Sequence, residues 1–192
     1  MIRRKRVFIA AALGAVFIAG ACASVPDERR FTYVGPLPDD TLQPDFNQYK
    51  AGVDDYLGRR CATLDCHGQI GRPLRIFSQN GLRGFDAAAP PSFPNVTGRG
   101  AVTEAERRDN FLAVVGLEPE IMARVIAGRG VEPNDLLLLK KPRALGAPPD
   151  HPEYAHKGGQ LMVTGDDGYK CITSWLAGSL DTNACEKAAS IP

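Results

Sequence analysis

Apolar residues recur at helical spacing in several short stretches, which polar, Pro-rich or Gly-rich chain separates. The first stretch consists of Phe46, Tyr49, Val53, Tyr56 and Leu57. These residues lie on one face of a helix, because they follow one another at spacings of three, four, three and one residues. Asp45 or Asn47 offers a side chain that caps the start of this helix. The pattern predicts an amphipathic helix that begins near residue 46 and ends near Cys61.

Further along the chain the same reasoning predicts shorter elements. We expect one or two helices in residues 103–127, a helical turn near residues 134–140, and a closing helix near residues 167–177. Asp166 precedes the last of these as a turn and helix cap. The first and closing helices should pack against each other. The predicted core residues are Tyr56, Leu57, Phe77, Phe111, Leu136, Leu138, Ile172, Trp175 and Leu176.

The composition favours short elements over long ones. The chain has 192 residues with 15 Pro and 20 Gly, and these residue types interrupt regular structure. The predicted fold class is therefore mainly α, as one small domain over residues 46–192 with long irregular loops. A domain of this size buries a core without help from a metal or a disulfide.

The N-terminus has the pattern of an export signal. Basic residues at positions 3–6 precede an apolar run from Val7 to Ala19, and small residues then lead to a cysteine. The run is too short and too rich in Ala and Gly for a comfortable permanent membrane span. Residues 1–22 are therefore predicted to be a removable signal peptide.

The end of this signal resembles the lipobox of bacterial lipoproteins, in the stretch Ala19-Gly20-Ala21-Cys22. The resemblance implies a lipid, such as palmitate, on Cys22 and anchorage to a membrane, with the domain on the periplasmic side or at the cell surface. Ala23 is not the Asp that retains some lipoproteins in the inner membrane, which favours the outer membrane. Residues 23–45 are rich in Pro and charge and poor in large apolar residues, so we expect a flexible tether. Cleavage without lipidation, or an uncleaved anchor, is the alternative.

Charge argues against nucleic acid as a partner. Without the four basic residues of the signal, 19 basic residues stand against 22 acidic residues, a net charge of −3. The remaining Lys and Arg are scattered and are not interleaved with aromatic residues. A chain of this kind offers no basic stripe for a phosphate backbone.

The four cysteines other than Cys22 form a near pair, Cys61 and Cys66, and a late pair, Cys171 and Cys185. Free thiols are uncommon in an exported protein. We predict a disulfide between Cys171 and Cys185, which would tie the closing helix to the C-terminal tail. Two free thiols in the late pair are the alternative.

The near pair belongs to the stretch from Arg60 to Gly68, in which His67 directly follows Cys66. The order Cys…Cys-His is that of the haem c attachment motif C-x-x-C-H, in which two thiols add to the haem vinyl groups and the His ligates the iron. Here four residues separate the cysteines, giving C-x4-C-H. A loop of this length reaches both vinyl groups only if it bulges.

Four later stretches, together with this one, resemble planctomycete-type cytochrome c domains. Gly68–Ile76 looks like the segment after their haem motif, and Val131–Lys140 looks like their "PxxSLLLxK" stretch. His156-Lys157-Gly158-Gly159 resembles their late His-Gly-Gly element, and the helix with Tyr169, Ile172 and Trp175 resembles their closing helix. The similarity runs in order over residues 46–178. The insert from Arg83 to Arg129 is not accounted for by it.

This resemblance implies a cytochrome c-like domain that binds one covalent haem c through Cys61 and Cys66, with His67 as the proximal iron ligand. His156 is the preferred sixth ligand, Met162 is the alternative, and an open sixth position is also conceivable. The implied function is electron transfer outside the cytoplasm, with a redox protein as partner. We predict an electron carrier or binding protein and not an enzyme, because no catalytic triad, nucleotide loop or calcium loop is present.

Three competing interpretations stay open on the sequence alone. Cys61 and Cys66 form a local disulfide in a haem-free, cytochrome-like structural or interaction lipoprotein. Alternatively, Cys61, Cys66, His67 and His156 supply four ligands to zinc. His151 and His156 are exposed loop histidines in the simplest interpretation. Met122 belongs to an apolar stripe from Leu117 to Ile126 and is expected in the core.

Overall fold

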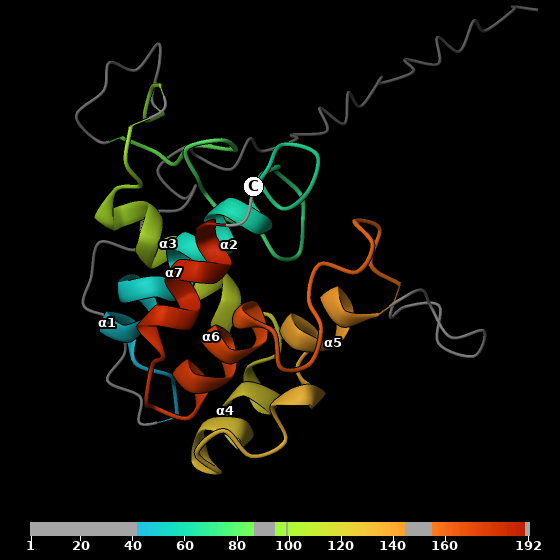
Figure 1. The fold of residues 1–192 in the computed structure, drawn as a ribbon. Coiled ribbons are helices and arrows are strands. Elements are labelled where there is room, and N and C mark those ends of the chain that lie inside the picture. Colours follow the sequence, from blue (N-terminus) through green and yellow to red (C-terminus); the bar gives the residue numbers. More distant parts are fainter. Residues whose placement is uncertain (1–41, 87–94, 99, 145–154, 191–192) are drawn as a thin grey trace, which may run out of the picture.

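The computed structural model describes residues 42–86, 95–98, 100–144 and 155–190, and Figure 1 shows their arrangement. Cys22, the predicted signal, most of the predicted tether and His151 lie outside the described residues. Within the described part the fold is mainly helical, as predicted, and it contains no β-strand. None of its helices is long and apolar enough to cross a bilayer.

The first helix runs without a break through α1 (Phe46–Gln48), the wider π-helical turn η2 (Tyr49–Val53) and α2 (Asp54–Arg60). Asp45 caps it, because its carboxylate accepts a hydrogen bond of 2.8 Å from the Gln48 N–H. The helix ends at Cys61, as the sequence predicts.

Two helices occupy the region predicted to hold one or two. α3 (Glu104–Val115) begins with a capping box, in which the Thr103 hydroxyl accepts from the Glu106 N–H and the Glu106 carboxylate accepts from the Thr103 N–H. α4 (Pro119–Ala127) starts with a proline at its first position, where a missing N–H costs nothing.

The remaining elements follow the predicted turn and closing helix. They are the single 3-10 turn η3 (Pro133–Asp135), α5 (Leu137–Arg143), α6 (Asp167–Leu176) and α7 (Thr182–Ser190). Asp166 caps α6 by accepting a hydrogen bond of 2.7 Å from the Tyr169 N–H. The helix α7 was not predicted.

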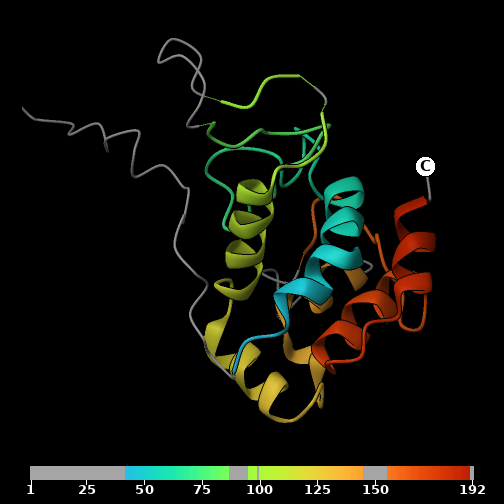
Figure 2. The same ribbon diagram turned by 90° about the vertical axis from the view of Figure 1, so that its left-hand side faces the viewer.

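An aromatic cluster joins the first helix, α3 and the closing helix α6. The ring of Tyr49 lies 5.4 Å from those of both Phe111 and Trp175, measured between centroids. The Trp175 indole N–H donates to the carbonyl oxygen of Asp45 at 2.9 Å. Figure 2 shows the first helix (cyan to teal) between α3 (yellow-green) and the red pair α6 and α7. The predicted packing of the first helix on the closing helix is therefore confirmed, and all nine predicted core residues are buried.

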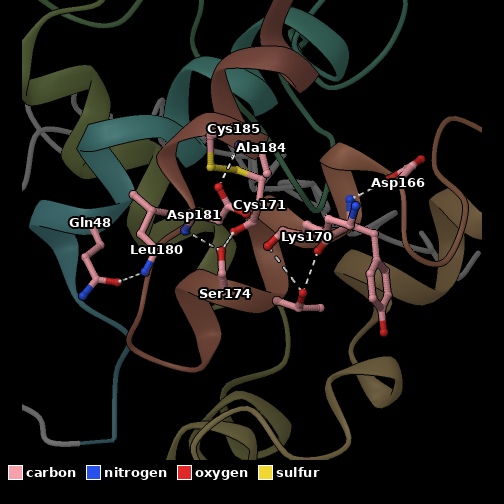
Figure 3. Close-up of a disulfide and its surroundings, with 11 residues drawn as sticks. Gln48, Asp166, Lys170, Cys171, Ser174, Leu180, Asp181, Ala184 and Cys185 are labelled. Atoms are coloured by element: carbon pink, nitrogen blue, oxygen red, sulfur yellow. Dashed lines mark hydrogen bonds between the residues drawn. A yellow bond between two sulfur atoms is a disulfide. The ribbon is translucent and has the colours of Figure 1, made fainter.

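A disulfide joins α6 to α7 through Cys171 and Cys185, the pairing that the sequence predicts (Figure 3). Gly52 in the first helix lies so close to this bridge that a Cβ there would stand 2.7 Å from the Cys185 Cβ. The Gln48 amide oxygen accepts from the Leu180 N–H at 3.2 Å. The C-terminal tail is thus a helix that packs against the first helix and is fixed to the closing one.

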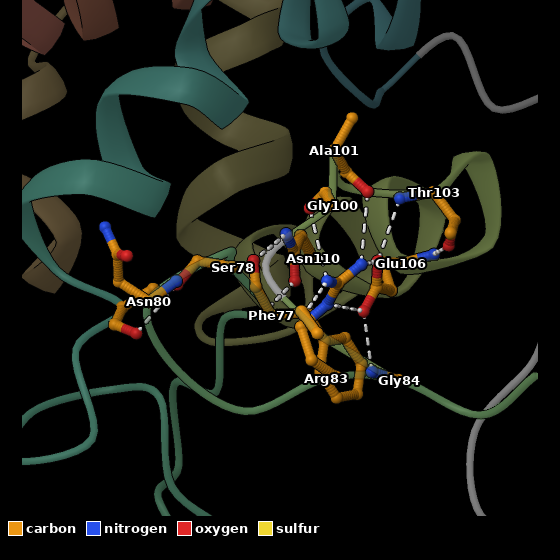
Figure 4. Close-up of polar contacts among 12 residues, drawn as sticks. Phe77, Ser78, Asn80, Arg83, Gly84, Gly100, Ala101, Thr103, Glu106 and Asn110 are labelled. Carbon is orange, nitrogen blue, oxygen red and sulfur yellow. Dashed lines mark hydrogen bonds and ion pairs between the residues drawn. The ribbon is translucent and has the colours of Figure 1, made fainter. Parts of the chain in front are cut away.

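A buried ion pair organises the insert that the resemblance did not account for. The Arg83 guanidinium donates to both carboxylate oxygens of Glu106, at 2.8 and 3.0 Å (Figure 4). The same guanidinium also donates to the carbonyl oxygens of Gly98, Gly100 and Ala101. The hydrogen bonds that Arg83 donates to the carboxylate help to keep the pKa of Glu106 below its usual value, even though burial alone would raise it. Arg83 therefore fixes the start of α3 to the chain on either side of residue 99.

Candidate haem site

The loop of the Cys-His motif folds back on itself through backbone hydrogen bonds. The His67 N–H donates to the Cys61 carbonyl oxygen at 2.9 Å. The N–H groups of Cys66 and Gly68 both donate to the Thr63 carbonyl oxygen, each at 2.9 Å. The extra residues of C-x4-C-H are thus taken up in a compact turn, which brings the backbone of His67 to Cys61.

Two glycines make this compact turn possible. A Cβ on either Gly68 or Gly81 would clash with the carbonyl oxygen of Ala62, which is backbone and has little room to move. The Ser78 hydroxyl donates to the same oxygen at 3.0 Å. The motif loop and the segment near Gly81 therefore share one tightly packed point.

A buried polar group fixes the segment that follows the motif loop. Asn110 of α3 accepts from the Phe77 N–H at 2.6 Å and donates to the Phe77 carbonyl oxygen at 3.0 Å. Asn110 also donates to Asp54 of the first helix at 2.9 Å. Burial raises the pKa of Asp54 to about 6, against the hydrogen bond from Asn110 and the charge of Arg107. This link ties the loop to both helices.

The His67 ring is half-buried and is held by one of its two nitrogens. Its Nδ1 lies 2.7 Å from the Leu74 carbonyl oxygen, which can only accept, so Nδ1 carries the proton and donates. The Ile76 N–H in turn donates to the His67 carbonyl oxygen at 2.9 Å. This tautomer leaves the Nε2 lone pair available, the arrangement in which a protein histidine ligates a metal.

His156 is held in the same way by its own turn. Its Nδ1 lies 2.8 Å from the Gly159 carbonyl oxygen, and the Gly159 N–H donates to the His156 carbonyl oxygen at 2.9 Å. Gly159 has a φ of +77°, which favours glycine. A Cβ on Gly158 would stand 3.1 Å from the His156 ring. The backbone at Gly158 therefore lies close against the His156 ring.

The turn that carries His156 is anchored to α5. The N–H groups of Leu161 and Met162 donate to the Pro142 carbonyl oxygen at 2.9 and 3.1 Å. The Arg143 guanidinium donates to the Thr164 hydroxyl at 2.8 Å. The end of α5 therefore determines where His156 lies.

The rings of His67 and His156 face each other from these two loops. Their centroids are 6.2 Å apart and their planes differ by 16°. Two metal–nitrogen bonds of about 2 Å, together with roughly 1 Å from each Nε2 to its ring centre, separate two rings on one metal by about 6 Å. The centroid distance of this pair equals that length. Met162, by contrast, is only 3 % exposed and packs in the hydrophobic core.

The electrostatic surroundings keep His67 neutral. Burial is the largest cause that lowers its pKa, and the hydrogen bond with Leu74 opposes this. The neighbouring His156 and the charges of Arg72 and Lys141 lower the pKa of His67 further. A neutral imidazole is the form that binds a metal.

The two thiols of the motif, Cys61 and Cys66, are both free and half-buried. Burial raises the pKa of the Cys61 thiol to about 12, against the effect of Arg60. A thiol with such a pKa is a poor zinc ligand, since zinc takes thiolate. In the described part of the chain, no three His, Cys, Asp or Glu residues gather where they could hold a metal ion. The structure thus offers neither the zinc set Cys61, Cys66, His67 and His156 nor the Cys61–Cys66 disulfide.

Three exposed apolar side chains lie close in sequence to the two histidines. Leu64 in the motif loop, Ile70 just after it, and Val163 beyond His156 are 57, 75 and 48 % exposed. They are three of the five large hydrophobic residues that are exposed in the described residues.

Sequence reasoning named both histidines and both thiols but missed the groups that orient them. The carbonyl oxygens of Leu74 and Gly159 are backbone atoms, and no residue type reveals them. Asn110, which fixes the segment after the loop, lies in the insert and gave no periodic signal. Comparison of the chain with protein-family models, curated proteins and solved structures finds no match.

Proposed function

We propose that this protein is an exported lipoprotein that binds one haem c and transfers electrons, in which Cys61 and Cys66 would attach the haem and His67 and His156 would ligate its iron. One observation carries this proposal: the two imidazole rings are 6.2 Å apart and nearly parallel, and each is anchored through Nδ1 to a backbone carbonyl. The domain would then be a cytochrome c-like fold.

The number of ligands favours haem over a bare metal ion. A structural zinc site takes four protein ligands, and among the described residues no three come together. Haem brings four nitrogen ligands of its own and needs one or two from the protein. The free thiols beside His67 are the groups that covalent attachment requires.

Haem supplies a centre that gains and loses one electron, and the residues of this chain orient it and set its potential. Two histidine ligands give a lower potential than one histidine and one methionine. Leu74 and Gly159 hold the rings and increase the basicity of both ligands through their hydrogen bonds. We therefore propose an electron carrier with a redox protein as partner and not an enzyme.

The place of action follows from the N-terminal sequence. We propose that residues 1–22 are the signal peptide with its lipobox, that Cys22 carries the lipid, and that residues 23–45 tether the domain to a membrane, with the outer membrane favoured. A Cys22→Ser variant should lack the mass of the lipid and should leave the membrane fraction.

The test is an intact mass and an absorption spectrum of the protein purified from its own membranes, because a foreign attachment system can reject C-x4-C-H. The proposal expects the mass of one covalent haem and a sharp absorption spectrum of the reduced protein.

Cys61→Ser or Cys66→Ser should lose one thioether bond. His67→Ala and His156→Ala should change the iron spectrum, whereas Met162→Leu, the matched control, should not. A mass without haem and with a Cys61–Cys66 disulfide would instead make this a haem-free interaction lipoprotein.

A further inference from the structure

Asn110 is a polar residue in a place where an apolar one is expected. It lies in the interior of α3, where Asn is less favourable than Ala or Leu, and its side chain is fully buried. Burying an amide costs free energy unless its polar atoms are hydrogen-bonded. The contacts of this amide therefore indicate what the side chain does.

The Asn110 amide binds both backbone groups of one residue, Phe77 (Figure 4). Its oxygen accepts from the Phe77 N–H at 2.6 Å, and one of its N–H groups donates to the Phe77 carbonyl oxygen at 3.0 Å. We call this pair of hydrogen bonds the Asn110 clamp. The second N–H donates to the Asp54 carboxylate at 2.9 Å, which holds the amide in one orientation. A hydroxyl or a carboxylate could not replace it, because only an amide offers one acceptor and two donors in one plane.

The clamped residue adjoins the segment that holds the His67 ring. The Leu74 carbonyl oxygen accepts from Nδ1 of His67 at 2.7 Å, and the Ile76 N–H donates to the His67 carbonyl oxygen at 2.9 Å. These two bonds close a ring between His67 and residues 74–76, and Phe77 follows directly. The side chains of Leu74 and Ile76 are buried in the core. A displacement of Phe77 would therefore carry the Leu74 carbonyl with it.

We propose that Asn110 is a positioning residue for His67: through Phe77 it holds the Leu74 carbonyl against Nδ1 of the ring, and so tunes the potential of an iron bound there. The statement about potential rests on the proposed function. A hydrogen bond at Nδ1 makes an imidazole a stronger donor to a metal, which favours the oxidised metal. Loss of the Asn110 clamp weakens this hydrogen bond, so it should raise the midpoint potential.

The test compares Asn110→Ala with Val114→Ala in the full chain, purified from its own membranes. Asn110→Ala removes the clamp. Val114→Ala is the matched control, because Val114 is also buried on α3 but its apolar side chain makes no hydrogen bond to residues 74–77. Circular dichroism verifies folding. Asn110→Ser, whose side chain is too short to bind both groups of Phe77, takes the place of Asn110→Ala if that variant does not fold.

In protein that carries haem, the readout is the midpoint potential. We expect Asn110→Ala to lower the ratio of oxidised to reduced iron at a fixed potential by at least about tenfold, a rise of about 59 mV. Val114→Ala should leave the potential where it is in the unmodified protein, although it lowers stability. An unchanged potential in Asn110→Ala, or an equal rise in both variants, would overturn the proposal.

Protein that carries no haem would contradict the proposed function but still tests the positioning of His67. Nitrogen NMR then reports which nitrogen of the ring carries the proton. The ratio of the Nδ1–H form to the Nε2–H form should fall at least about tenfold in Asn110→Ala and stay unchanged in Val114→Ala. The same ratio in all three proteins would show that the clamp does not act on the ring.

Hydrogen exchange in the unmodified protein needs no variant. The Phe77 amide proton and the Nδ1 proton of His67 should exchange with solvent at rates within about tenfold of each other, because both need the clamped segment to open. A far faster exchange at His67 would mean that the ring moves independently of Phe77, and the proposal would be wrong.

Discussion

The helical core and the two histidine loops are held together by different kinds of contact. In the core, large side chains such as Tyr49, Phe111 and Trp175 bury themselves against one another, and a disulfide joins the last two helices. In the loops, backbone groups bind backbone groups, and glycines allow the close approach. The core is stabilised by buried apolar area, whereas the loops are shaped by individual hydrogen bonds. Changes in the core should therefore reduce stability, and changes in the loops should mainly alter the site.

The largest effect should come from Trp175→Ala. The ring is fully buried between the first and closing helices and donates to Asp45. Its removal should lower the free energy of unfolding by about 3–5 kcal/mol. Urea denaturation monitored by circular dichroism measures this. A loss below about 1 kcal/mol would mean that the aromatic cluster is not the centre of the core.

The next effect should follow from replacing both Cys171 and Cys185 by Ser. The bridge closes a loop with a sequence separation of 14, and a closure of this length contributes about 3 kcal/mol. The variant should unfold at lower urea while the histidine pair stays in place. Unchanged stability would show that the packing of α7 on the first helix holds α7 in place without the disulfide.

Asp54, which Asn110 links to the segment after the motif loop, should make the stability of the protein depend on pH. Burial raises the pKa of Asp54 from 3.8 to about 6, so the folded protein holds this proton to higher pH than the unfolded chain. Stability should therefore fall as pH rises from 4 to 6, by up to roughly 3 kcal/mol, and stay at the lower level above pH 6. Asp54→Asn should remove this fall. The measurement is the free energy of unfolding of both proteins at pH 4 and pH 7, and a parallel fall in the variant would contradict it.

Gly158→Ala should affect the site far more than stability. The new Cβ would press on the His156 ring at 3.1 Å, so the ring should turn, while the free energy of unfolding should change by less than about 1 kcal/mol. Gly100→Ala is the control, because a Cβ there meets nothing within 4 Å. The absorption spectrum of the iron should change in the first variant only. Identical spectra of the two variants would contradict a role for His156 as an iron ligand.

The smallest effect should come from the ion pair of Lys50 and Glu104, which lie 3.0 Å apart at the surface. Lys50→Ala should change the free energy of unfolding by about 0.2–0.5 kcal/mol. Denaturation at low and high salt measures it, and a loss above about 1 kcal/mol would show that this pair organises α3.

The core was predictable from sequence because periodicity records which side chains are buried. All nine predicted core residues are buried, the first helix ends at Cys61, and the closing helix ends within one residue of the predicted position 177. The helix α7 was missed, since its buried residues Ala184, Cys185 and Ala188 are small and give a weak apolar pattern. The two late cysteines nevertheless predicted the disulfide that joins α7 to α6.

The candidate site was predictable only in part. His67, His156 and the thiols stand out by residue type, but their orientation depends on the carbonyl groups of Leu74 and Gly159, which every residue possesses. The sequence favoured His156 and kept Met162 as the alternative. The fold adds that His156 lies against His67 and that Met162 is buried in the core.

The most direct test of the account is the electron paramagnetic resonance spectrum of the oxidised native protein at low temperature. Two histidines on one iron, with planes only 16° apart, predict a rhombic low-spin signal, because nearly parallel imidazole rings separate the iron d-orbitals. This signal should be lost in His156→Ala and retained in Met162→Leu. A high-spin signal, a signal retained in His156→Ala, or no iron signal at all would contradict the pairing of His67 with His156.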